Sequence, residues 1–155
     1  MKLTKEEAYE VHEAVEEEDM GPEQVIRECV DATYIALGTL WTYDLRPTCG
    51  PVPVDGLAEQ PHYLLVTISE HLAKAMEADE CRSIQMCATM VIQLAETIVR
   101  KIDPRLRLDL FFDEVHRANM DKEPGVVSPR PLKGSAWRPP DIAAILGALR
   151  RDETP

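Results

Sequence analysis

Residues 28–40 read ECVDATYIALGTL, and the rest of the chain is organised around them. Two acids open this stretch, which otherwise carries no charge. Asp31 is the one charged residue between Glu28 and Asp44. On a helix, residues three apart share a face, so both carboxylates lie on or beside the stripe that is expected to be buried. An ionised acid in apolar surroundings is costly unless it is paired, hydrogen-bonded or bound to a metal. We therefore expect a cation at this face.

A second pair of acids lies upstream, where Glu7 and Glu10 flank the apolar stripe of another predicted helix. The residues between the two helices include Met20-Gly21-Pro22, which predict a short turn. Antiparallel packing through that turn would bring the two acid pairs together. Four carboxylates without fixed positive partners suit Mg²⁺ or Mn²⁺, which prefer oxygen ligands. The predicted ligands are Glu7, Glu10, Glu28 and Asp31.

Length and composition favour one globular domain over residues 1–155, since 155 residues with 45% hydrophobic content can bury a real core. The net charge of -11 argues against binding of nucleic-acid polymers or anionic membranes, which attract basic surfaces. No apolar run is long enough to span a bilayer, and the N-terminus is charged, which predicts a cytoplasmic protein, or one in the host cytoplasm if viral. All four cysteines are expected to be reduced thiols: Cys29, Cys49, Cys81 and Cys87.

Apolar periodicity predicts an all-α helical bundle. Pro and Gly residues interrupt the helical pattern at 44–61 and 123–140, which are expected to be loops. The first loop opens an extended middle segment, residues 44–105. The expected helices cover residues 4–19, 22–43, 62–78, 80–102, 106–122 and 141–151.

The fourth of these helices carries a regular apolar stripe that is expected to form core. Glu96 interrupts its uncharged part and is either a hydrogen-bonded interior acid or an additional metal ligand. The histidines show no shared ligand spacing; they are His12, His62, His71 and His116.

Two further stretches of the sequence have the character of family motifs. Residues 112–122 read FDEVHRANMDK, and residues 137–142 read WRPPDI, with Lys133 between them. Together with the E-x-x-E and E-x-x-D acid pairs, they resemble the motifs of the phosphoribosyl-ATP-pyrophosphohydrolase-like branch of the all-α, MazG-type nucleoside triphosphate pyrophosphohydrolases. The resemblance covers roughly residues 3–43 and 106–142.

This resemblance implies a homodimer or homotetramer of helical-bundle protomers that hydrolyses a nucleoside triphosphate to monophosphate and pyrophosphate. It implies Mg²⁺ on the four acids, with Asn119 and Lys122 near the phosphates and Lys133 among the substrate contacts. The chain departs from the family in its long segment 44–105, in the missing leading helix and in Asp121, where many relatives have serine.

Hydrolysis between the α- and β-phosphates requires charge neutralisation and a nucleophilic water, and metal held by carboxylates supplies both. Glu10 is the predicted proton acceptor, and Lys122 is expected to assist at the phosphates. Guanine presents adjacent N–H donors that one carboxylate accepts, so Asp141 with Trp137 stacked on the base predicts a preference for dGTP or GTP. A viral branch of the family is similar in removing dGTP. The plainer alternatives are an N-cap role for Asp141 and a hydrophobic capping role for Trp137.

Two other classes remain as alternatives. A di-iron carboxylate bundle expects Glu-x-x-His on two helices, whereas the one such motif, Glu59 to His62, is interrupted by Pro61. A non-catalytic acidic interaction protein would explain the charge but not the acids on the buried face.

Overall fold

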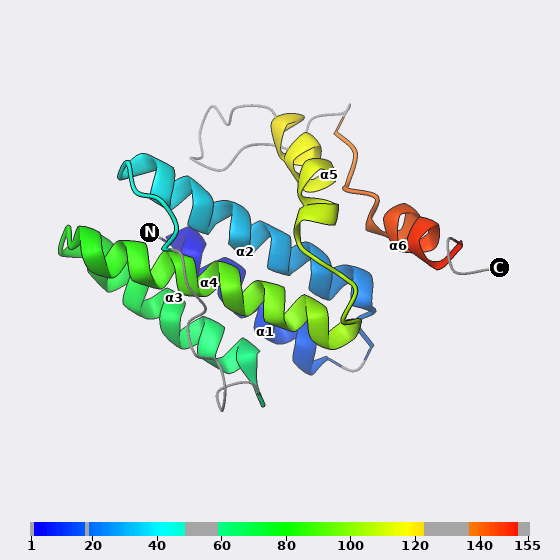
Figure 1. Cartoon of the computed structure of the whole chain (residues 1–155), viewed down its shortest axis with the longest axis horizontal. Helices are drawn as coiled ribbons and strands as arrows, with labels where there is room; N and C mark the ends of the chain where they lie inside the picture. The colour runs from blue at the N-terminus through cyan, green and yellow to red at the C-terminus, as the bar shows by residue number, and fades with distance from the viewer. Residues whose placement is uncertain (1, 18, 49–58, 123–136, 152–155) are drawn as a thin grey trace. The chain divides into compact units, whose positions relative to one another are not determined.

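The computed structural model describes residues 2–17, 19–48, 59–122 and 137–151, which form six α-helices and no strand (Figure 1). The predicted all-α fold is therefore confirmed for this part of the chain. The helices are α1 (Lys2–Glu16), α2 (Pro22–Thr42), α3 (Pro61–Glu77), α4 (Cys81–Ile102), α5 (Asp109–Met120) and α6 (Ile142–Arg151).

The chain divides into two compact units, Met1–Leu108 and Asp109–Pro155, and each is described by itself. In the first unit four helices form a bundle in which α1 packs on α2 and α3, and α4 packs on the same two helices (Figure 1). Leucine, isoleucine and valine side chains fill its core. The stripe predicted on α4 is buried, namely Ile84, Cys87, Val91, Leu94 and Ile98.

The connection between α1 and α2 is short, as predicted. Helix α1 ends at Glu16 rather than at Asp19, because consecutive acids at a helix C-terminus oppose the helix dipole. Gly21 is the N-cap of α2, and Pro22 occupies the first helical position, where its missing N–H costs no hydrogen bond. This turn places the two acid-bearing helices next to each other.

Helices α2 and α3 end in the same way, with an aspartate in the left-handed region just after the C-cap. Asp44 has φ 52° and Asp79 has φ 53°. After α2, the backbone amide of Leu45 donates to the carbonyl of Leu40 at 2.8 Å. The backbone amide of Asp44 donates to the carbonyl of Trp41 at 3.1 Å. This Schellman pattern normally uses glycine, and aspartate is among the residues that tolerate its backbone.

The segment after α4 departs from the prediction that the next helix begins near Leu106. Leu106 and Leu108 are buried in extended or turn conformation, and α5 begins only at Asp109. Oε2 of Glu96 accepts the amide of Leu108 at 2.8 Å, and Oε1 accepts Nε of Arg100 at 2.7 Å. Glu96 is therefore a hydrogen-bonded acid of the fold, which was the first of its two predicted roles.

In the second unit, α5 and α6 contact each other. Phe111, Val115 and Ala118 of α5 are buried, whereas Leu110 is 40% exposed. The described part of the chain contains no helix that is long and apolar enough to cross a membrane. Cys29, Cys81 and Cys87 are free thiols, and Cys49 lies outside the described residues.

Candidate functional site

Three of the four predicted metal ligands meet between α1 and α2. Glu7, Glu28 and Asp31 each offer a carboxylate oxygen, and these oxygens lie within 4.8 Å of one another. Glu7 comes from the second turn of α1, while the other two lie one turn apart on α2. Packing of α1 on α2 through the short turn therefore brings three of the four acids together. We name Glu7, Glu28 and Asp31 the carboxylate cluster.

Glu28 is the buried member of the carboxylate cluster, with 6% of its surface exposed. Burial raises its pKa, and the nearby acids Asp31 and Glu10 raise it further, while Arg27 lowers it. Oε1 of Glu28 accepts hydrogen bonds from Nη2 of Arg27 at 3.1 Å, from its Nε at 3.3 Å, and from the side-chain Nε2 of Gln24. The expectation that the acids lack a fixed positive partner is therefore wrong for Glu28. Its charge is only partly balanced, since its pKa stays raised despite the contact with Arg27.

Glu10 lies outside the carboxylate cluster. Its side chain is exposed on α1, three residues after Glu7, yet its charge reaches Glu28 and contributes to the raised pKa of that acid. This position beside the cluster leaves Glu10 accessible to water and to a bound ligand.

The predicted phosphate-binding pair is in contact in the second unit. Nζ of Lys122 donates to Oδ1 of Asn119 at 2.6 Å. Both side chains are partly exposed, with Asn119 in the last turn of α5 and Lys122 two residues beyond its end. Lys133, also predicted to contact substrate, lies outside the described residues.

Trp137 and Asp141 both have structural partners. Nε1 of Trp137 donates to the carbonyl of Ala118 at 2.8 Å, which anchors the indole to α5. Oδ1 of Asp141 accepts the amide of Ala144 at 2.9 Å, so Asp141 is the N-cap of α6. The N-cap role, given above as the plainer alternative, is thus present in the structure.

Glu114 and Arg117 hold this segment against α5. Oε1 of Glu114 accepts the amide of Asp141 at 3.0 Å and Nη2 of Arg117 at 2.7 Å. Arg117 also donates to the carbonyl of Pro139 at 3.3 Å. These bonds lower the pKa of Glu114, chiefly through Arg117 and then through the Asp141 amide. Two residues of the FDEVHRANMDK motif therefore orient the WRPPDI stretch.

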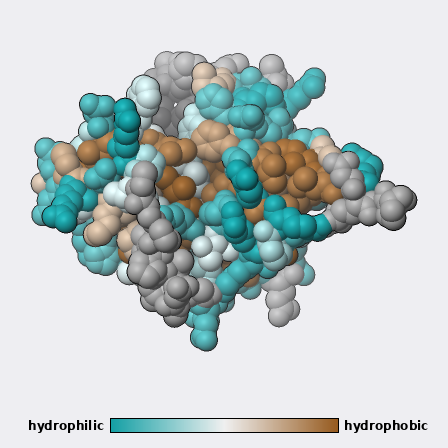
Figure 2. Space-filling view, viewed as in Figure 1, coloured by the Kyte–Doolittle hydropathy of each residue, from teal (hydrophilic) through white to brown (hydrophobic). Residues whose placement is uncertain are grey.

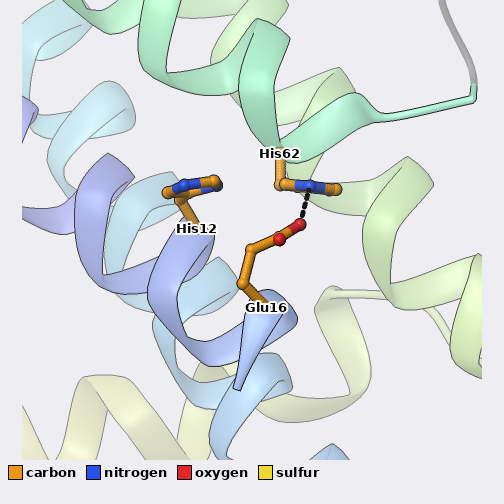
Figure 3. Close-up of side chains that lie close together, drawn as sticks. All are labelled: His12, Glu16 and His62. Carbon is orange, nitrogen blue, oxygen red and sulfur yellow. Dashed lines mark hydrogen bonds and ion pairs between the residues drawn. The ribbon is translucent and has the colours of Figure 1, made fainter. Parts of the chain in front are cut away.

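A second ligand group, which the sequence analysis did not find, lies elsewhere in the first unit. His12, Glu16 and His62 offer ligand atoms within 4.8 Å of one another (Figure 3). One signal was available, because His12 and Glu16 are four residues apart and so share a face of α1. His62 lies 46 residues beyond Glu16, and no spacing rule connects residues at that distance.

The N-terminal third of the chain matches a known family. The family model of phosphoribosyl-ATP pyrophosphohydrolase covers residues 1–49, which include α1, α2 and all four predicted acids. The match does not extend to residues 106–142, the second stretch on which the resemblance was based. No curated protein and no solved structure matches the chain. Residues 1–49 are thus similar to this pyrophosphohydrolase family, as the two acid pairs predicted.

Proposed function

We propose that the protein is a metal-dependent nucleoside triphosphate pyrophosphohydrolase, which cleaves its substrate to a monophosphate and pyrophosphate. The observation that carries this proposal is the convergence of Glu7, Glu28 and Asp31 from two helices. The family match over the same helices supports the reaction class. A non-catalytic helical protein would gain nothing from placing Glu28 in the interior, where its charge is costly.

The residues of the carboxylate cluster fit a hard divalent cation. All three donors are carboxylate oxygens, the ligand type that Mg²⁺ and Mn²⁺ prefer. Burial raises the pKa of Glu28 despite the contact with Arg27, which is consistent with incomplete compensation of its negative charge. A cation at the cluster would complete that compensation, and Mg²⁺ is the ion we propose.

The chemistry divides among the chain's own residues. Glu7, Glu28 and Asp31 would hold the ion, which when bound neutralises polyphosphate charge and lowers the pKa of water. Glu10, exposed beside the cluster, would accept the proton of the attacking water on its carboxylate. In this proposal Lys122 and Asn119 donate hydrogen bonds to phosphate oxygens of the bound substrate.

The substrate we propose is a guanine nucleotide, with dGTP preferred. Metal and phosphate contacts are common to all triphosphates, so the base must be read by other groups. A carboxylate has about four acceptor positions, so the N-cap bond of Asp141 to Ala144 leaves capacity for the two donors of guanine. Trp137, partly exposed and fixed by its bond to Ala118, offers a ring for stacking.

Pyrophosphate release from a nucleotide panel tests the reaction. With Mg²⁺ present, the full chain should release pyrophosphate from dGTP, and removal of metal by EDTA should stop the release until Mg²⁺ is added back. Release of inorganic phosphate alone, or turnover that EDTA leaves intact, would refute the proposed reaction.

We also propose that the protein is a homodimer or homotetramer. Hydrophobic side chains reach the surface over α2 and α4 (Figure 2). Trp41 of α2 is 87% exposed and Met86 of α4 is 53% exposed, which is unusual for large apolar residues of a monomer. Sedimentation at micromolar concentration should show at least a dimer, and an active monomer there would contradict the assembly but not the reaction.

A further inference from the structure

We propose that His12, Glu16 and His62 form a second metal site, separate from the carboxylate cluster, that binds Zn²⁺. Ligand atoms of the three side chains lie within 4.8 Å of one another. Figure 3 shows the carboxylate of Glu16 directed at the ring of His62, with His12 one turn earlier on the same helix. We name these residues the histidine cluster.

Helix geometry explains why the three side chains meet. His12 and Glu16 are four residues apart on α1, so they project from the same face. His62 is the second residue of α3, which packs against α1, and Pro61 before it starts that helix. Nε2 of His62 and Oε1 of Glu16 are 2.8 Å apart. Two elements of the bundle therefore fix the cluster, and no loop is required to form it.

One buried atom of the cluster lacks a protein partner. Nδ1 of His12 is buried and has no hydrogen bond to any group that the structure describes. Leaving such a group unsatisfied is costly, and native proteins rarely tolerate it. Tyr63 packs on both imidazoles, at 4.6 Å from the ring of His12 and 4.7 Å from that of His62, which provides a partly apolar wall. A ligand that recognises imidazole nitrogen would account for the presence of two histidines there.

The donor set selects the ion. Two imidazole nitrogens and one carboxylate oxygen are a ligand combination found in zinc sites, whereas Mg²⁺ favours oxygen donors alone. Zinc to nitrogen bonds of about 2.0–2.1 Å place tetrahedral ligands about 3.3 Å apart. The ligand atoms now lie within 4.8 Å of one another, so small rotations of the side chains would bring them to that spacing. Burial of His62, which is 7% exposed, restricts its alternatives.

One member of the histidine cluster borders a pocket. His62 lines a pocket of about 390 Å³ in the first unit, and the pocket is lined mainly by apolar residues of α1, α2, α3 and α4. No member of the carboxylate cluster lines this pocket. Three protein ligands leave the fourth zinc position for water, as in zinc sites that keep an open position.

Binding of Zn²⁺ to the metal-free full chain tests the proposal. Excess Mg²⁺ is included to occupy the carboxylate cluster, so that calorimetry follows the histidine cluster. We expect one Zn²⁺ per chain, and visible absorption typical of nitrogen ligation when Co²⁺ replaces it. Because the loss of a supporting residue alone lowers zinc affinity about 10–100-fold, His62→Gln and Glu16→Gln should lower it by at least about 100-fold.

Matched control variants distinguish Zn²⁺ binding at the histidine cluster from nonspecific Zn²⁺ binding at other acids or histidines. His71→Gln changes an exposed histidine outside the cluster, and Glu17→Gln changes the exposed acid next to Glu16. Both should leave Zn²⁺ affinity unchanged. Asp31→Asn should also leave it unchanged, so that failure of the proposed reaction and failure of the zinc site are distinguishable.

Two results would overturn the proposal. The first is absence of Zn²⁺ binding by the wild-type chain in excess Mg²⁺, which would leave the bond between Glu16 and His62 as a link between α1 and α3 only. The second is full binding by Glu16→Gln and His12→Gln. Glu16 has a side chain that is 48% exposed, so its variant is expected to fold and to report on ligation directly.

Discussion

The two units hold their candidate functional side chains by different physical means. In the first unit, the hydrophobic bundle encloses Glu28, and burial raises its pKa. In the second, hydrogen bonds from α5 hold Trp137 and Asp141 at partly or fully exposed positions. A buried carboxylate is costly until a cation binds beside it, so the first unit is suited to metal binding and catalysis. Hydrogen bonds that fix the orientation of exposed side chains leave them accessible to a ligand, so the second unit is suited to substrate recognition. The comparison predicts that the first unit controls turnover and the second controls substrate affinity and choice.

The largest effect is expected from Asp31→Asn in the first unit. The amide keeps the size of the side chain but removes a charge from the carboxylate cluster, so kcat should fall about 10³-fold. Pyrophosphate release measures this, with helical circular dichroism as the check on folding. Asp19→Asn, in the exposed turn after α1, is the matched control and should retain full activity. An active Asp31→Asn enzyme would end the assignment of the cluster.

A smaller effect is expected from Lys122→Ala in the second unit. Loss of a charge-assisted hydrogen bond to phosphate should lower kcat/KM about 10–100-fold, mainly through a higher KM. Lys74→Ala, at an exposed lysine of α3, should have no such effect. If Lys122→Ala reduces kcat alone, the division of labour between the units is wrong.

Asp141→Asn separates recognition from helix capping. Asparagine is as good an N-cap as aspartate, so the bond to the amide of Ala144 should survive. Its amide group cannot accept both donors of guanine, so the preference for dGTP over dATP should shrink about tenfold. The comparison uses kcat/KM for dGTP, dATP, dCTP and dUTP. A wild-type enzyme that prefers a pyrimidine, or none of the four, would exclude guanine recognition.

The smallest effect concerns the bonds that hold the second unit together. Arg117 and the amide of Asp141 lower the pKa of Glu114 below 4.5, its unshifted value. An acid with a lowered pKa in the folded state stabilises the fold above its unfolded pKa, and this contribution is lost as pH falls through the folded pKa. Glu114→Gln should therefore reduce stability at pH 7 by no more than about 1 kcal/mol. Its thermal unfolding should also depend less on pH below 4.5 than that of the wild type.

Much of the first unit could be predicted from sequence because its signals are local. The periodicity of α4 and the Gly21-Pro22 signal gave the correct buried stripe and the correct start of α2. Spacing along each helix, with the short turn between α1 and α2, also predicted that Glu7 would lie near Glu28 and Asp31.

Other features depend on groups that sequence spacing does not connect. Arg27 was not expected to pair with Glu28, since adjacent residues point to different sides of a helix and only a long, flexible side chain reaches back. His62 meets His12 only because α3 packs on α1. Leu106 and Leu108 fit a helical pattern, yet tertiary burial holds them outside α5.

The two tryptophans of the chain lie one in each unit, and their surroundings differ. Trp41 is 87% exposed near the end of α2, while Trp137 is partly buried with its indole N–H bonded to Ala118. In a single protomer their fluorescence should therefore differ in emission wavelength and in access to a soluble quencher. A Trp41→Phe protein would carry a single emitter that follows the second unit alone, and a Trp137→Phe protein would follow the first. Unfolding followed by the fluorescence of each variant would therefore show whether the two units unfold together or in sequence.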